Sequence, residues 1–192
     1  MAFPNIEVKS TLYLPDKSFH RVETEISDLE NHAMDICFDY AQEALEDGNP
    51  PIGAVLLYHN PETRDSMHWA AKTQDKTTDH VFDHAETIAY FMAQPVVKNR
   101  LENCTLVTTA EPCGSICAGP YAAAKIGKIL FAASRSLIYE NTGLMRPREF
   151  NLHEILRIGN TNTVVTEGFR AHEALIKFFD WKRLRDEGLV AA

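Results

Sequence analysis

The chain has 192 residues, of which 45% are hydrophobic and 24% charged, a composition typical of one globular domain with a buried core. Its formal net charge of −8 disfavours broad electrostatic capture of a nucleic-acid backbone, which relies on a face rich in Lys and Arg. The sequence contains no uninterrupted apolar run long enough to span a bilayer, and its start, MAFPNIEVKS, has neither the basic residues nor the apolar core of a secretion signal. We therefore expect a cytoplasmic protein with no membrane partner.

The four cysteines are Cys37, Cys104, Cys113 and Cys117. In a chain without a secretion signal they are better interpreted as thiols or metal ligands than as a disulfide framework. We expect Cys37 and Cys104 to pack as small apolar side chains.

The N-terminal residues 1–26 predict an extended arm or short strands. Apolar and polar residues alternate there around Ile6 and Leu12, and Pro4 and Pro15 interrupt the pattern. We divide the chain into this arm and one domain over residues 27–192.

An amphipathic helix is predicted to follow the arm. Ser27 and Glu30 have the spacing of a capping box, and apolar residues then recur at helical intervals until Gly48. After a turn at residues 49–51, the run 52–58 predicts a buried strand, which a hairpin connects to a second strand at 67–71. Residues 72–83 show no periodicity and predict a polar loop.

Strands and helices alternate in the remainder of the chain. Helices are predicted at 84–93, 113–125, 149–157 and 171–185, and strands at 104–109, 128–133 and 163–166. This order predicts an α/β protein with a three-layer α/β/α arrangement and a sheet of mixed strand directions.

Two short segments place metal-binding side chains where a predicted helix begins. His84 and Glu86 lie at one such junction, and Cys113 and Cys117 lie at the next. Ligands commonly bind where the strands of an α/β sheet end. Because Cys113 and Cys117 are separated by one helical turn, a helix directs both sulfur atoms to the same side.

One imidazole and two thiolates suit Zn²⁺ and leave a fourth tetrahedral position for water, as a catalytic zinc site requires. We therefore predict one Zn²⁺ per chain, with His84, Cys113 and Cys117 as ligands and no organic cofactor. Glu86 is the predicted catalytic residue, because a helix places its carboxylate beside the water, where it accepts a proton and later returns it.

These residues resemble the signature of the cytidine deaminase superfamily, H-x-E followed by P-C-x-x-C. The similarity extends from about residue 29 to 185, and includes residues 51–55, 109–113 and 118–119. Residues 126–131 and the tail 166–179 are most similar to the bacterial branch containing tRNA adenosine, guanine and cytosine deaminases.

That resemblance implies a cytidine deaminase-like fold with a five-stranded sheet, one zinc per chain, and a homodimer whose partner borders the active site. It also implies hydrolytic deamination of a nucleobase or nucleoside of the guanine, cytosine or adenine type, with release of ammonia. The substrate contacts that it suggests are Gly53, Ala54, Thr73, Phe82, Ala85, Glu111 and Pro112. Among them, Phe82 is the candidate for stacking on the base.

The chain departs from the family pattern in two places. Its two cysteines are one residue further apart than in C-x-x-C, so we expect a rearranged or bulged helix start. At Thr73, many relatives carry an asparagine that contacts the base, and Thr73 or Gln74 takes that position here.

Three alternatives stay open at this point. The first is a tRNA-specific adenosine deaminase, which the acidic chain disfavours because such an enzyme must attract RNA. The second is a non-catalytic, dimeric zinc-binding interaction module. The third is a closed structural zinc site in which His80 or Asp83 supplies the fourth ligand.

Overall fold

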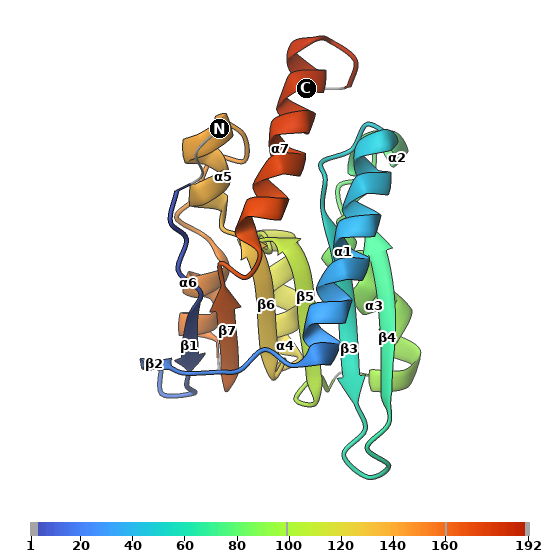
Figure 1. Ribbon diagram of the computed structural model, residues 1–192. Helices are drawn as coiled ribbons and strands as arrows, with labels where there is room; N and C mark the ends of the chain where they lie inside the picture. The colour runs from blue at the N-terminus through green and yellow to red at the C-terminus, as the bar shows by residue number, and fades with distance from the viewer. Residues whose placement is uncertain (1–3, 99, 160, 191–192) are drawn as a thin grey trace.

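The computed structural model describes residues 4–98, 100–159 and 161–190. Residues 1–3 of the predicted arm, and 99, 160, 191 and 192 of the predicted domain, lie outside the described part. The elements, labelled in Figure 1, are β1 (Lys9–Tyr13), β2 (Phe19–Val22), α1 (Asp28–Glu46), β3 (Gly53–His59), β4 (Ser66–Lys72), α2 (Asp75–Thr78), α3 (Ala85–Val97), β5 (Cys104–Ala110), a π-helical turn (Gly114–Ala118), α4 (Gly119–Ala123), β6 (Lys128–Ala133), α5 (Arg135–Thr142), α6 (Leu152–Ile158), β7 (Thr163–Glu167) and α7 (Ala171–Asp186).

The sheet has seven described strands in the order β2-β1-β7-β6-β5-β3-β4, so the expectation of five strands is wrong. Strands β5, β6 and β7 are parallel to one another, and the remaining pairs are antiparallel, which confirms the mixed directions. The two further strands come from the segment predicted as an arm. Strand β1 pairs with β7 from Lys9↔Glu167 to Tyr13↔Thr163, and β2 forms the edge beyond it.

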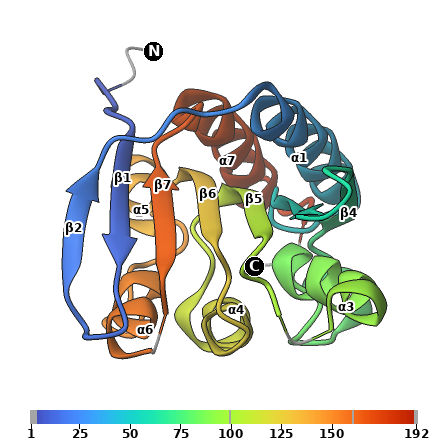
Figure 2. The same ribbon diagram turned by 90° about the horizontal axis from the view of Figure 1, so that it is seen from below.

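Helices cover both faces of the sheet. Figure 2 shows α1 and α7 on one face and α3, α4 and α6 on the other. Every residue of β5 is buried, as expected for a central strand that is covered on both sides. The largest fully buried side chains include Phe131, Leu56, Leu106 and Leu130, so the core is centred on β3, β5 and β6.

The start of α1 agrees with the capping-box prediction. The Ser27 hydroxyl accepts a hydrogen bond from the Glu30 backbone N–H (3.2 Å), and the Glu30 carboxylate accepts one from the Ser27 N–H (3.0 Å). The helix ends at Glu46, and Gly48 follows with a φ of 82°, a backbone conformation that favours glycine.

The predicted continuous helix over 113–125 is wrong. The structure has a π-helical turn at Gly114–Ala118, followed by the short helix α4. The Ala118 N–H donates to the Cys113 carbonyl oxygen at 2.9 Å, a π-type bond that closes a wider turn than an α-helix makes. The additional residue between the two cysteines is thus accommodated as a bulge, as its spacing predicts.

Three further elements differ from the prediction. The predicted loop 72–83 contains α2, whose Lys76 and Thr77 N–H groups donate to the buried Asn49 side chain. Helix α5 was not predicted, and α6 begins at Leu152 instead of 149 because Asn151 caps it.

None of the described helices combines the length and the apolar character that a membrane span requires.

Candidate metal and catalytic site

Three side chains converge between the start of α3 and the π turn. The Cys113 and Cys117 sulfur atoms lie 3.5 Å apart, and the Nδ1 atom of His84 lies 3.8 Å from the first and 3.4 Å from the second. A tetrahedral Zn²⁺ holds two thiolates and one imidazole nitrogen at separations of about 3.5–3.8 Å, given zinc bonds of about 2.0–2.3 Å. The triangle therefore has the dimensions of a zinc site.

The first turn of α3 is fixed by buried hydroxyl groups. His84 is the N-cap residue, and the next N–H, of Ala85, donates to the Thr73 hydroxyl at 3.3 Å. The Tyr121 hydroxyl donates to the Glu86 carbonyl oxygen at 2.8 Å. These bonds connect the start of α3 to the end of β4 and to α4, so that His84 and Glu86 keep a constant orientation relative to the cysteines.

The π turn determines the positions of the cysteines. Cys113 is its N-cap residue, with extended backbone angles, and the nearly complete turn that follows brings Cys117 back beside it. The Thr87 hydroxyl lies 3.8 Å from the Cys117 sulfur atom. Because Thr87 belongs to the first turn of α3, this contact connects the two ligand-bearing segments a second time.

The surroundings favour a thiolate at Cys113. Hydrogen bonds, first from Cys117 and then from His84 and backbone N–H groups, outweigh burial and lower the pKa of the Cys113 thiol to about 3. The neighbouring Cys113 and burial raise the pKa of Cys117 well above its usual value. The pair thus carries one negative charge before a metal binds, and a bound cation favours ionisation of the second thiol.

Glu86 is a buried carboxylate without a full set of partners. Its side chain is 2% exposed, and its Oε2 atom has no hydrogen-bond partner among the described residues. Burial raises the pKa of Glu86. A buried oxygen without a partner is costly, so the arrangement fits a metal centre that supplies a water molecule for this oxygen to bind.

The fourth ligand of a closed site is not in place. His80 and Asp83 pair with each other through Nδ1 and Oδ1 at 3.1 Å. In the described part of the chain, the only cluster of three or more ligand atoms within 4.8 Å of one another consists of His84, Cys113 and Cys117. The set therefore leaves one tetrahedral position open, which is typical of catalytic zinc.

Two of the predicted substrate contacts, Thr73 and Ala85, meet at the start of α3 beside the candidate ligands, and a third, Gly53, begins β3. Thr73 is 2% exposed and holds Ala85, which is itself buried against the site. The Gly53 N–H donates to the Thr109 hydroxyl at 3.2 Å. A Cβ at Gly53 would lie 2.0 Å from the Cys37 carbonyl oxygen, so glycine is needed here for the close packing of α1 on β3.

The other predicted contacts lie in different surroundings. Phe82 is 52% exposed and its ring lies beside His80, with centroids 5.8 Å apart. The Glu111 carboxylate accepts the Arg135 N–H at 2.9 Å and so caps α5. Ala54 is paired in the sheet with Ala71 and Thr108, and Pro112 is buried. Their contact with substrate stays a prediction.

Three supporting residues were missed in the sequence. Tyr121 follows Cys117 by one helical turn, and Thr87 follows His84 by nearly one, so helical spacing could have identified both. Thr109 could not have been found in this way. Its hydroxyl accepts from Gly53 and donates to the Pro51 carbonyl oxygen at 3.3 Å, a bridge between strands that are far apart in sequence.

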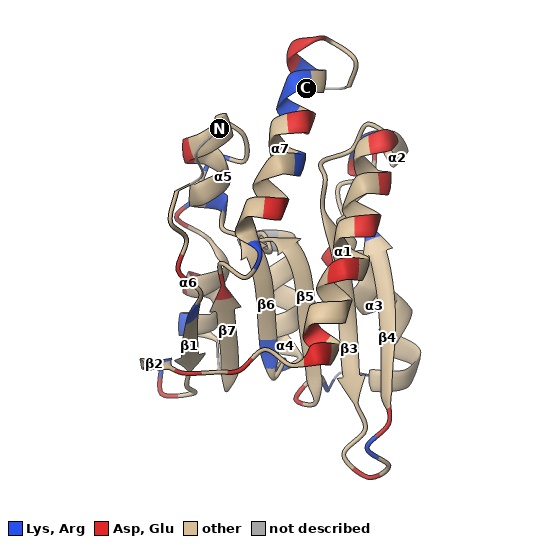
Figure 3. Cartoon of the chain, viewed as in Figure 1, with Lys and Arg blue, Asp and Glu red and all other residues tan. Residues whose placement is uncertain are grey.

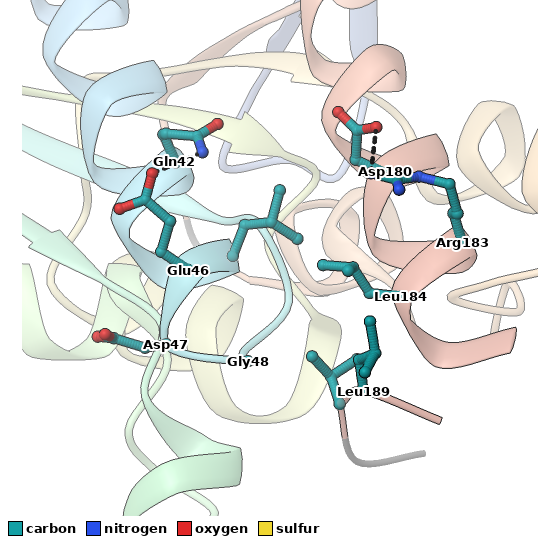
Figure 4. Close-up of a pocket in the computed structure, with 10 residues that line it drawn as sticks. Gln42, Glu46, Asp47, Gly48, Asp180, Arg183, Leu184 and Leu189 are labelled. Atoms are coloured by element: carbon teal, nitrogen blue, oxygen red, sulfur yellow. Dashed lines mark hydrogen bonds and ion pairs between the residues drawn. The ribbon is translucent and has the colours of Figure 1, made fainter. Parts of the chain in front are cut away.

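A pocket of 440 Å³ lies between the C-terminal ends of α1 and α7. Figure 4 shows Gln42 and Glu46 of α1 facing Asp180 and Leu184 of α7, with Leu189 closing one side. None of the zinc-site residues lines it. Its walls carry the carboxylates of Glu46, Asp47 and Asp180 but neither His nor Cys, so the triangle at α3 remains the candidate site for the chemistry.

An open three-ligand zinc site with a buried carboxylate, built at the end of an α/β sheet, defines a zinc-dependent hydrolase. The family model of the cytidine and deoxycytidylate deaminase zinc-binding region matches residues 27–133, more than half of the chain. The chain therefore belongs to this family and is a hydrolytic deaminase with zinc as its cofactor.

Two relatives in sequence are deaminases of different substrates. The chain is 32% identical over 121 residues to a tRNA-specific adenosine deaminase of Buchnera aphidicola, covering 62% of this chain and 76% of the relative. It is 28% identical over 158 residues to a probable cytosine deaminase of Schizosaccharomyces pombe, covering 80% of this chain and 92% of the relative.

Solved structures share the fold. A guanine deaminase from Nitrosomonas europaea superimposes with a TM-score of 0.65 at 22% identity, covering 83% of this chain and 87% of that one. A structure from a study of tRNA:A34 deaminases gives a TM-score of 0.60 at 22% identity, covering 77% of this chain and 99% of that one. At this identity the similarity establishes the cytidine deaminase-like fold alone.

Proposed function

We propose that the chain deaminates a free nucleobase or a nucleoside of the guanine, cytosine or adenine type. The observation that carries the chemistry is the unpartnered Oε2 of Glu86 beside the triangle of His84, Cys113 and Cys117. The three ligands hold the metal, which when bound supplies the Lewis acidity that activates a water molecule near neutral pH.

Glu86 moves the protons of the reaction. Its carboxylate takes the proton that the attacking water releases and donates it to the departing amino group, which leaves as ammonia. Burial raises the pKa of Glu86, which lets the side chain hold this proton between the two steps. Thr73 and Tyr121 keep the first turn of α3, and with it Glu86, in the orientation that both transfers need.

The distribution of charge supports a small substrate. Figure 3 shows carboxylates spaced along α1 and α7, and α1 carries no Lys or Arg. The basic cluster at the end of α7 is largely neutralised, because Lys182 pairs with Asp186 (2.5 Å) and Arg183 with Asp180 (3.5 Å). Arg185 lies over the Trp181 ring instead of projecting as a free charge. Such a surface attracts RNA weakly.

The second candidate is a tRNA-specific adenosine deaminase, favoured by the relative that is 32% identical. The two differ in their response to salt, because an RNA enzyme depends on contacts with phosphates and a nucleobase enzyme does not. The test is ammonia release from the zinc-loaded protein, with guanine, cytosine, adenine, their nucleosides and an anticodon stem-loop RNA, each at low and high salt.

Turnover of a base or nucleoside that changes little with salt supports the first candidate and identifies the substrate. Turnover of the RNA alone, with a steep loss at high salt, establishes the second candidate and overturns the first. Glu86→Gln serves as the blank in every reaction.

A homodimer and a cytoplasmic location complete the proposal. The outer face of α3 exposes Phe91 (58%), Met92 (49%) and Val96 (47%), an apolar strip suited to contact with a second copy. Four unpaired cysteines, two of them metal ligands, suit a reducing compartment.

A further inference from the structure

The β1–β2 hairpin has no part in the chemistry described above, and neither has helix α6. Both lie outside residues 27–133, which the family model matches. Figure 2 shows α6 packed beneath β1 and β7, and Figure 1 shows the same neighbourhood from the side. A series of contacts connects the hairpin to α6, and α6 to the π turn at Gly114–Ala118.

The first step is a hydrogen bond between the hairpin and α6. Tyr13, the last residue of β1, is 5% exposed, and its hydroxyl lies 2.5 Å from Nδ1 of His153 in α6. Burial, and then the nearby Glu167 and Glu111, raise the pKa of Tyr13 to about 12, so its hydroxyl keeps its proton and donates it. The Nε2 atom of His153 faces Glu167, at 3.9 Å.

The second step is the dependence of α6 on such contacts. The helix has only 7 residues, and helices of this length are unstable without tertiary support. Its inner side buries Leu152, Ile155 and Leu156, which set its distance from the sheet. The bond from Tyr13 adds a directional contact in the first turn, where His153 lies.

The third step is the contact between α6 and the metal-binding turn. Gly114, the residue after Cys113, packs so closely on the start of α6 that a Cβ there would lie 2.3 Å from the Phe150 carbonyl oxygen and 2.9 Å from the Asn151 Cα. Asn151 is the N-cap residue of α6. Any displacement of this helix start is therefore transmitted directly to the backbone between the two cysteines.

We propose that Tyr13 and His153 are positioning residues for the metal site, through which the N-terminal hairpin holds α6 against Gly114 and so maintains the π turn between Cys113 and Cys117. The inference rests on the metal site proposed above and gives the hairpin a role in it. A π turn is rarely stable by itself, and this one carries an additional residue between its ligands, which is why it needs support from outside.

The test uses the full-length chain with Tyr13→Phe, which removes only the hydroxyl. Two quantities are measured: the rate of zinc transfer to a chromophoric chelator, and the absorption bands of the Co²⁺-substituted protein, which report the geometry of the thiolate ligands. We expect zinc release to be about tenfold faster. Loss of a group that orients metal ligands typically lowers metal affinity by about 10- to 100-fold. We also expect the cobalt bands to shift.

Ser10→Ala is the matched control. Ser10 lies in the same strand, and its hydroxyl bonds to Thr166 at 2.9 Å and Thr24 at 2.6 Å, so the variant weakens the attachment of the hairpin without touching α6. We expect its cobalt spectrum to equal that of the wild type. His153→Asn keeps an acceptor near the position of Nδ1 and should restore slow release, whereas His153→Leu should behave like Tyr13→Phe.

Equal release rates and equal cobalt spectra in Tyr13→Phe and Ser10→Ala would overturn the inference. If Tyr13→Phe fails to fold, the comparison of His153→Asn with His153→Leu decides in its place, and identical behaviour of those two variants overturns the inference. A wild-type chain that binds Co²⁺ without thiolate bands would overturn the metal site itself. The two proposals therefore fail in distinguishable ways.

Discussion

The sulfur atoms of Cys113 and Cys117 lie 3.5 Å apart across the π turn. A disulfide bond requires about 2.0 Å, so a small movement joins the two atoms once no metal separates them. We expect the zinc-free protein to form this disulfide when the two-electron oxidant diamide is added, with loss of two titratable thiols. The zinc-loaded protein should keep all of its thiols, as counted by thiol titration in denaturant.

Cys113→Ser is the control for that oxidation, because it leaves Cys117 without a partner. Cys37 and Cys104 are buried and should stay reduced in both proteins. Equal thiol loss with and without zinc would contradict the proposed ligands.

Glu86→Gln should separate metal binding from turnover. The amide cannot accept and return a proton, so we expect ammonia release to fall by at least about 100-fold. The three ligands are untouched, and zinc content by atomic absorption should stay at one per chain. Retention of activity would mean that another group moves the protons.

Gly53→Ala should destabilise the fold strongly. The new Cβ would lie 2.0 Å from the Cys37 carbonyl oxygen, which is backbone and cannot rotate away. We expect the free energy of unfolding to fall by about 3 kcal/mol or more, at the upper end for overpacking. The control is Gly119→Ala, where no atom lies within 4 Å of the new Cβ and φ is −56°, and whose urea midpoint should be unchanged or slightly higher.

Tyr13 should make the protein sensitive to alkaline pH. Its pKa is raised from 10.0 to about 12 in the folded chain, chiefly by burial. Below about pH 10 the phenol is neutral in both states, and its contribution to stability is complete. Between about pH 10 and about pH 12 the unfolded chain loses the proton first, so the free energy of unfolding falls by about 1–2 kcal/mol after allowance for solvent screening.

The check on Tyr13 is urea denaturation of the wild type and Tyr13→Phe at several pH values in this window. The wild type should lose its advantage over the variant as pH rises. Parallel pH profiles for the two proteins would show that Tyr13 does not titrate as its surroundings require.

Phe91→Glu should dissociate the proposed homodimer. A carboxylate on the apolar strip of α3 would be buried without a partner in the interface, which is costly. We expect the mass measured by light scattering to fall from that of two chains to that of one. Ile176→Lys, which changes a single exposed residue (49%) of α7, should leave the mass unchanged. A wild type that is already monomeric would reject the dimer.

The sequence determined the chemistry and most of the elements. Helical and alternating periodicities are local properties, and so they located α1, the β3–β4 hairpin, β5, β6, β7 and α7 within a few residues. His84, Cys113 and Cys117 could be predicted as metal ligands, and Glu86 as the group that moves protons, because few reactions need that set of side chains at that spacing. The altered cysteine spacing even indicated a bulge, since a regular α-helix cannot absorb one additional residue.

The tertiary structure alone decided how these parts support one another. No local pattern shows that Tyr13 bonds to His153, that the start of α6 rests on Gly114, or that Thr109 bridges Gly53 and Pro51. Each contact joins segments that are distant in sequence. It therefore contributes to the free energy of folding only after the sheet has brought those segments together. Short strands were among the predictions for residues 1–26, but only the tertiary structure shows that they extend the sheet, because the exposed edge of β7 is available to pair with β1.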